Sequence, residues 1–118
     1  MLPIRSWPSF IHARPFDEAW RQYELDDEDL SRLQLELVKD PEAGDVVSGT
    51  GGLRKLRFAR KGEGKSGSLR IGYANIPNHG LVLLMVAYEK KGKSDLTPDD
   101  KRDIKIRLTR LKDALDSK

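Results

Sequence analysis

Two alternating segments joined by a basic, glycine-rich loop constrain the fold of this chain most strongly. Residues 53–59 (LRKLRFA) and residues 69–75 (LRIGYAN) each alternate apolar side chains with polar or small ones. This alternation is typical of strands that are buried on one face. Glycines precede the first segment and interrupt the loop at residues 60–68. The pattern therefore predicts a β-hairpin whose two strands are residues 53–59 and 69–75.

The predicted hairpin concentrates positive charge. Residues 54–70 contain seven basic side chains and one acidic one, Glu63, which gives a local charge of +6. Because side chains of a strand alternate between faces, Lys55 and Arg57 lie together on the face opposite Leu56 and Phe58. A solvated outer face of a sheet commonly carries such residues. A polyanion, most simply a nucleic-acid backbone, is the functional alternative.

The charge of the whole chain is divided between its halves. Residues 1–52 contain five basic and eleven acidic side chains, whereas residues 53–118 contain seventeen and eight, and the net charge is +3. The second half is therefore the candidate for an anionic partner. A chain of 118 residues suits one core, so we expect residues 1–118 to form a single domain.

Cysteine usage and apolar runs limit the cellular context. The absence of cysteine excludes disulfides and cysteine-ligated metals. The longest apolar run, residues 81–87, is too short to span a membrane, and the first ten residues do not resemble a signal peptide. We therefore expect a cytoplasmic protein without membrane contact.

The remaining segments complete an α+β pattern. We expect a short strand within residues 6–12, helices over about 16–23 and 27–39, a loop over 41–52 and a strand over 81–88 that is apolar on both faces. Asp26 and Thr97 are the expected N-caps of the second helix and of a C-terminal helix that begins at Pro98. The prediction is a small, mainly antiparallel sheet of three to four strands, with two N-terminal helices and one C-terminal helix packed on one face.

Familiar enzymatic motifs fit this sequence poorly. The segment GEGKS at residues 62–66 lacks the first glycine of a P-loop, since Ala59 is there, and a strand instead of a helix follows. The two histidines, His12 and His79, would have to converge on one phosphate to act as acid and base. No metal site and no cofactor are expected. Lysine, arginine and tyrosine side chains on a sheet could still cleave RNA, because they can stabilise phosphorane charge and transfer protons.

Several segments together resemble the RelE/HigB superfamily of type II toxins, most closely its HigB-like branch. They are residues 40–60 (DPEAGDVVSGTGGLRKLRFAR), 64–67 (GKSG), 70–73 (RIGY), 88–90 (YEK) and 95–98 (DLTP). The resemblance covers about residues 16–115. It implies a RelE-like fold and a metal-independent endoribonuclease that cuts mRNA in the ribosomal A site and inhibits translation. It also implies a cognate antitoxin, often of the helix-turn-helix type, through which alone the toxin would meet operator DNA.

The resemblance also implies a set of functional residues. The catalytic candidates are Lys55, Arg57, Arg70, Tyr88 and Lys90. Arg57 and Arg70 would bind the scissile phosphate, Lys55 or Lys90 would transfer a proton, and Tyr88 would stack on a base or donate a proton. Further cations are candidates for contact with RNA or the ribosome: Arg54, Arg60, Lys61, Lys65, Lys91 and Lys93.

Two other functions are compatible with the same residues. One is a non-enzymatic nucleic-acid- or ribosome-binding domain of the same fold, which is favoured by three departures from the family pattern. Gly72-Tyr73-Ala74 replaces an aromatic pair, Glu89 replaces a small neutral residue, and Thr97 or its neighbours stand where RelE has a tyrosine near the start of the last helix. The other is a protein-binding module whose basic face meets an acidic partner. Cleavage of mRNA would distinguish the toxin from both of these functions. Binding to RNA at low salt would distinguish the nucleic-acid-binding domain from the protein-binding module.

Overall fold

The computed structural model describes residues 7–61, 68–89 and 95–117. These residues form a five-stranded sheet in the order β1-β5-β4-β3-β2. The strands are β1 (Ser9–His12), β2 (Asp45–Val46), β3 (Arg54–Phe58), β4 (Leu69–Ile76) and β5 (Leu81–Glu89). β1 runs parallel to β5, and every other neighbouring pair is antiparallel. The predicted hairpin is therefore β3–β4, and the predicted α+β class is confirmed.

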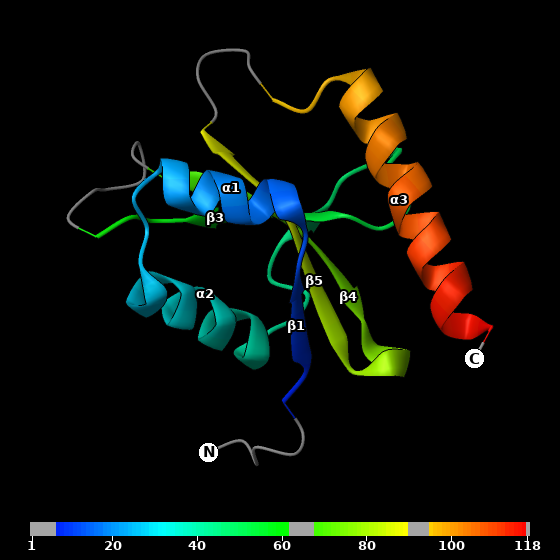
Figure 1. Ribbon diagram of the computed structural model, residues 1–118, viewed down its shortest axis with the longest axis horizontal. Helices are drawn as coiled ribbons and strands as arrows, with labels where there is room; N and C mark the ends of the chain where they lie inside the picture. Colours follow the sequence, from blue (N-terminus) through cyan, green and yellow to red (C-terminus); the bar gives the residue numbers. More distant parts are fainter. Residues whose placement is uncertain (1–6, 62–67, 90–94, 118) are drawn as a thin grey trace.

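Helices cover both faces of this sheet (Figure 1). On one face, α1 (Arg14–Gln22) and α2 (Asp27–Lys39) bury Phe16, Trp20 and Leu33 against alternate residues of β3, β4 and β5. On the other, α3 (Pro98–Asp116) buries Ile104 and Leu108 against a smaller apolar cluster. The expectation that all helices share one face is wrong, because β5 carries apolar side chains on both of its faces and needs cover on each.

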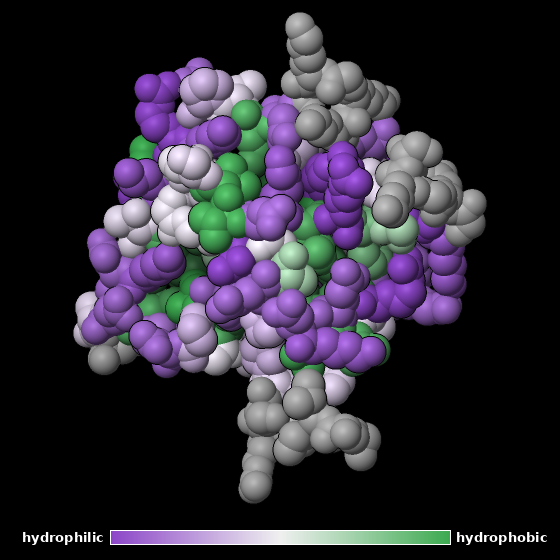
Figure 2. Space-filling model, turned by 180° about the vertical axis from the view of Figure 1, so that it is seen from behind, coloured by the Kyte–Doolittle hydropathy of each residue, from purple (hydrophilic) through white to green (hydrophobic). Residues whose placement is uncertain are grey.

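The second cluster is built from residues that alternate with those of the first. Leu53 immediately precedes β3, Ala74 lies in β4, and Leu83 and Met85 lie in β5. A register shift between Gly72 and Tyr73 adjusts the pairing of β4 with β5 at this level. The face seen from behind carries mostly hydrophilic side chains, with hydrophobic patches visible between them (Figure 2).

Helix starts agree closely with the sequence. Asp26 and Asp29 form a reciprocal capping box at α2, and Thr97 and Asp100 form one at α3. Each box satisfies two backbone N–H groups that have no partner inside the helix. Within the described ranges, no helix has both the length and the apolar character needed to cross a bilayer.

The sheet has more strands than predicted. β2 lies within residues 41–52, which the sequence indicated as a loop, and pairs with Arg54 and Lys55 of β3. Both of its residues are exposed, so no apolar alternation marks it. β5 is an interior strand, as expected, since it pairs with β1 and β4, but β4 occupies the middle of the sheet.

Candidate functional site: a basic row across three strands

Two arginines and a tyrosine form one row across the sheet. Arg57 of β3 pairs with Arg70 of β4, and Arg70 pairs with Tyr88 of β5. Directly paired residues have Cβ atoms roughly 5 Å apart, so the three side chains start close together. Alternation places them on the face that α3 covers, beyond the apolar cluster of that face.

The two guanidinium groups of the row have no acidic partner among residues 7–61, 68–89 and 95–117. Arg57 is exposed, and Arg70 is half-buried and donates a hydrogen bond from Nη1 to the Ser68 carbonyl at 3.3 Å. Like charges directly opposite each other destabilise a sheet. An anion bound between them would relieve this repulsion, and the row is therefore a candidate anion site.

A carboxylate links the row to a fourth side chain. The Lys55 ammonium lies 2.9 Å from Oδ2 of Asp95, and the Tyr88 hydroxyl donates to Oδ1 of the same residue at 2.6 Å. The backbone N–H of Leu96 also donates to Oδ1, at 2.8 Å. Asp95 lies just before the capping box of α3, so the start of this helix places its carboxylate between β3 and β5.

These contacts change the acidity of both partners. Burial, followed by the hydrogen bond to the Asp95 carboxylate, raises the pKa of Tyr88 well above that of a free tyrosine. Burial alone would raise the pKa of Asp95. Hydrogen bonds from Tyr88, Lys55 and the Leu96 N–H outweigh it and hold that pKa well below its usual range. Near neutral pH, Tyr88 is therefore a neutral phenol and Asp95 a carboxylate.

A pocket of about 360 Å³ opens beside the cluster. Tyr88 and Asp95 lie on its wall, together with apolar side chains from β5 and α3 such as Val86 and Ile104. Pro15 of α1 also lines the pocket. The hydroxyl of Tyr88 is thus at the border between the basic row and a partly apolar hollow.

Gly72 allows the strands of the site to pack closely. It pairs with Lys55 on one side and Val86 on the other. A Cβ atom at Gly72 would lie 2.6 Å from Cγ2 of Val86 and 3.3 Å from Cδ2 of Leu53. A glycine at position 72 therefore fits the tight packing of this face, where Gly72 and Ala74 are both buried.

Three of the predicted RNA-binding cations lie away from this row. Arg54 donates to the carbonyl oxygens of Gly44 and Glu42 on the face opposite Lys55. Arg60 pairs with Glu89 at 3.4 Å and lies over the ring of Tyr23.

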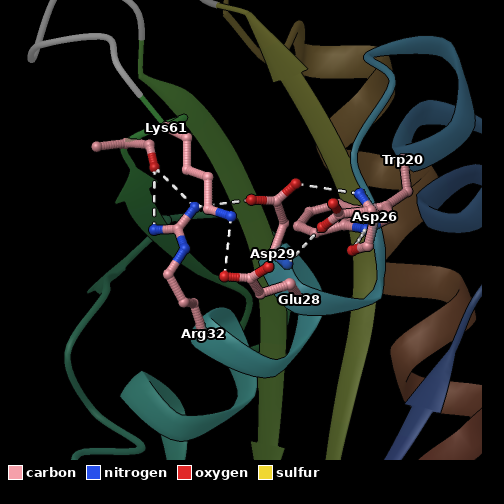
Figure 3. A network of polar contacts seen from close by, with 7 residues as sticks. Trp20, Asp26, Glu28, Asp29, Arg32 and Lys61 are labelled. Carbon is pink, nitrogen blue, oxygen red and sulfur yellow. Dashed lines mark hydrogen bonds and ion pairs between the residues drawn. The ribbon is translucent and has the colours of Figure 1, made fainter.

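Lys61 belongs to a polar network at the start of α2 (Figure 3). Its ammonium lies 2.9 Å from the Glu28 carboxylate, and Arg32 donates both to Asp29 and to the Ala59 carbonyl. The guanidinium of Arg32 also lies 4.5 Å from the ring centroid of Phe58. The network attaches the first turn of α2 to the end of β3, so Lys61 has a structural partner.

The other predicted site residues, Lys65, Lys90, Lys91 and Lys93, lie outside the described residues. The structure thus brings together Lys55, Arg57, Arg70 and Tyr88. Sequence reasoning missed Asp95, which it interpreted only as part of a helix start. The described ranges contain no group of three or more histidine, aspartate or glutamate side chains that could hold a metal ion.

Comparison with known proteins identifies the fold. No protein-family model matches the sequence. A double arginine-to-alanine mutant of the E. coli toxin RelE in the free state is similar, with a TM-score of 0.55 and 15% identity over 86% of this chain and 97% of that one. A chain of the intact E. coli RelBE toxin–antitoxin complex aligns with a TM-score of 0.52 and 18% identity, over 72% of this chain and 99% of the other. The chain therefore has a RelE-like fold.

Proposed function

We propose that this protein is the toxin of a type II toxin–antitoxin pair and that it cleaves mRNA in the ribosomal A site. The RelE-like fold supports the class of protein. The observation that carries the activity is the row in which Arg57 and Arg70 stand side by side next to Tyr88, with Lys55 on the same face. In such a row, the arginines can bind one phosphate, and the neighbouring side chains can serve the oxygen that attacks it and the oxygen that leaves it.

The chemistry needs no metal. The ribose 2′-oxygen attacks the phosphorus, the bond to the 5′-oxygen breaks, and the products are a 2′,3′-cyclic phosphate and a 5′-hydroxyl. One proton leaves the 2′-hydroxyl and one joins the 5′-oxygen. Arg57 and Arg70 stabilise the negative charge that accumulates on the phosphorane, which is the task that preorganised cations perform best.

Tyr88 can donate its hydrogen to RNA once the Asp95 carboxylate, which accepts it in the structure, releases it. Its raised pKa makes it a poor base near neutral pH, because the phenolate is scarcely populated. Lys55 can then serve the other proton transfer or add to the charge on the phosphate. Lys90, two residues after Tyr88, remains a further candidate for proton transfer.

The ribosome completes the site in this proposal. The row lies half-exposed on a sheet, and a flexible RNA on such a surface must still be held in line for attack. Alignment of the reacting atoms supplies much of the rate of such reactions. A codon held in the A site presents mRNA in one geometry, and a small basic sheet can then act on it.

Primer extension tests the proposal. A defined mRNA is translated in a purified system, with and without ribosomes, in the presence of wild-type protein, Arg57→Ala or Arg70→Ala. We expect in-frame cuts that require ribosomes and disappear in both variants. Arg102→Ala removes an exposed cation that pairs with Asp99 within α3, and it is the matched control. Cuts that persist in both Arg57→Ala and Arg70→Ala contradict the assignment of the site.

A second function is a non-enzymatic domain that binds RNA or the ribosome through the same row. One observation favours it: the Lys55 ammonium and the Tyr88 hydroxyl already donate hydrogen bonds to the Asp95 carboxylate. Co-sedimentation of the wild-type protein with ribosomes, without any cleavage of the mRNA, identifies this function.

We further propose a cognate antitoxin as partner. The structural relative from the RelBE toxin–antitoxin complex supports this class of partner. In the proposal it is a helix-turn-helix protein, and operator DNA is bound only through it. Co-expression with the product of the adjacent gene should yield a complex that does not cleave mRNA and that retards operator DNA. The toxin alone should leave that DNA unbound.

A further inference from the structure

Asp95 makes more contacts with the candidate site than any role in starting a helix requires. The N-cap of α3 is Thr97, which completes its capping box with Asp100 and makes no use of Asp95. The Asp95 side chain points instead to the sheet and contacts Lys55 of β3 and Tyr88 of β5. It thereby bridges two strands that are not neighbours in the sheet.

We infer that Asp95 is a positioning residue of the proposed site, whose carboxylate holds the Lys55 ammonium and the Tyr88 hydroxyl in the arrangement in which they meet RNA. The inference rests on the proposed function. Asp95 acts through Lys55 and Tyr88 and does not itself contact the substrate.

The hydrogen-bond distances around Asp95 support this role. Each carboxylate oxygen accepts from one functional side chain, at 2.9 Å from Lys55 and 2.6 Å from Tyr88. The Leu96 N–H, which donates to Oδ1 at 2.8 Å, prevents the carboxylate from rotating freely. Lysine has four rotatable side-chain bonds, and immobilising it before the substrate arrives lowers the entropy lost in the reaction.

The contact also sets the direction of the Tyr88 hydroxyl group. A phenol has one hydrogen and two lone pairs. When its hydrogen is given to Asp95, Tyr88 has only its lone pairs to offer to RNA or to Arg70, its direct neighbour in the sheet. Tyr88 then accepts a hydrogen bond from the ribose 2′-hydroxyl or from an arginine. It becomes a donor to RNA only when Asp95 releases it.

Asp95→Asn tests the inference with little disturbance of the fold. The amide has nearly the same shape as the carboxylate, and its oxygen still accepts from the Leu96 N–H. We expect the rate of mRNA cleavage at saturating ribosome concentration to fall about 10- to 100-fold, as is common when reacting groups are misplaced. The ribosome concentration that gives half of the maximal rate should not change. Asp95→Glu restores the charge but displaces it by one methylene, and it should stay at least about 10-fold below wild type.

A second readout is independent of cleavage. The ionisation of tyrosine is followed by absorbance at high pH, and the signal of Tyr88 is identified by comparison with Tyr88→Phe. Loss of the carboxylate should lower the titration midpoint of Tyr88 by about 1–3 pH units. Asp99→Asn, which removes an exposed carboxylate from the first turn of α3, is the control and should change neither readout.

The outcomes separate the inference from the proposed function. Wild-type protein that cuts nothing overturns the proposed function and, with it, this role for Asp95. Active wild type together with an equally active Asp95→Asn overturns the inference alone, as does an Asp95→Glu variant with full activity. An unchanged Tyr88 titration in Asp95→Asn overturns it as well.

Discussion

Arg57 stands directly opposite Arg70 in the β3–β4 pair, so two guanidinium groups share one position of the sheet. Neither has an acidic partner in the described ranges. A sheet selected for stability alone would avoid this arrangement. In the proposed function, this cost in stability accompanies a site that binds the phosphate of RNA.

Replacing one member of the pair should separate stability from activity. We expect Arg57→Thr to raise the free energy of unfolding by about 0.2–1 kcal/mol, because it removes the cross-strand repulsion and introduces a good strand former. Cleavage should disappear in the same variant. Chemical denaturation measures the first effect and primer extension the second. Arg57→Lys keeps the like charges together and should show no gain in stability, and a destabilised Arg57→Thr would contradict the repulsion.

The packing at Gly72 predicts a specific loss of stability. Gly72→Ala places a methyl group 2.6 Å from Cγ2 of Val86, so the free energy of unfolding should fall by about 1–3 kcal/mol. Val86→Ala removes the opposing methyl groups. In the double variant, the loss caused by Gly72→Ala should shrink by at least about 0.5 kcal/mol, as expected for residues in contact. Strictly additive losses in urea denaturation would show that the two side chains do not meet.

The Tyr73 hydroxyl anchors the segment between α2 and β2. It donates to the Pro41 carbonyl at 2.8 Å and accepts from the Gly44 N–H at 2.9 Å, and Tyr73 is fully buried. Tyr73→Phe leaves both backbone groups without this partner and should cost about 1–3 kcal/mol. Urea denaturation measures the loss. Tyr23→Phe, at a half-buried tyrosine, is the control, and an equal loss there would argue against the anchor.

Asp95 should make stability depend on pH in the acid range. Its pKa is lower in the folded protein than in the unfolded chain, so its contribution is fully present above about pH 5 and is lost as the pH falls through and below the unfolded value near 4. We expect unfolding free energies measured between pH 3 and pH 7 to decline less steeply on acidification in Asp95→Asn than in wild type. Parallel curves for the two proteins would contradict this.

Local patterns predicted most of the secondary structure. Alternation identified β3 and β4, and the capping residues Asp26 and Thr97 identified the starts of α2 and α3. β2 was not predicted, because its two exposed residues show no apolar alternation. The placement of α3 on the second face was not predicted either, since the apolar stripe of a helix does not indicate which face of a sheet it covers.

The site could be predicted only in part, for a related reason. The row of Arg57, Arg70 and Tyr88 follows from strand alternation once the register is known. The partners of the other cations are distant in sequence: Arg60 meets Glu89, and Lys61 meets Glu28. Charge counts along the chain could not distinguish these paired cations from unpaired ones. Asp95 was missed because its contact with Lys55 joins residues on two different elements.

The parallel pairing of β1 with β5 has a consequence for the synthesis of this protein. Ser9 pairs with Leu81, so β1 cannot form its pairing in the sheet until β5 has been synthesised. Contacts between such distant segments form slowly and late. A nascent chain that lacks β5 has neither Tyr88 nor the support for α1, and Asp95 follows later still. In a protein proposed to attack translating ribosomes, this order of assembly delays the proposed site until both β5 and Asp95 have been made.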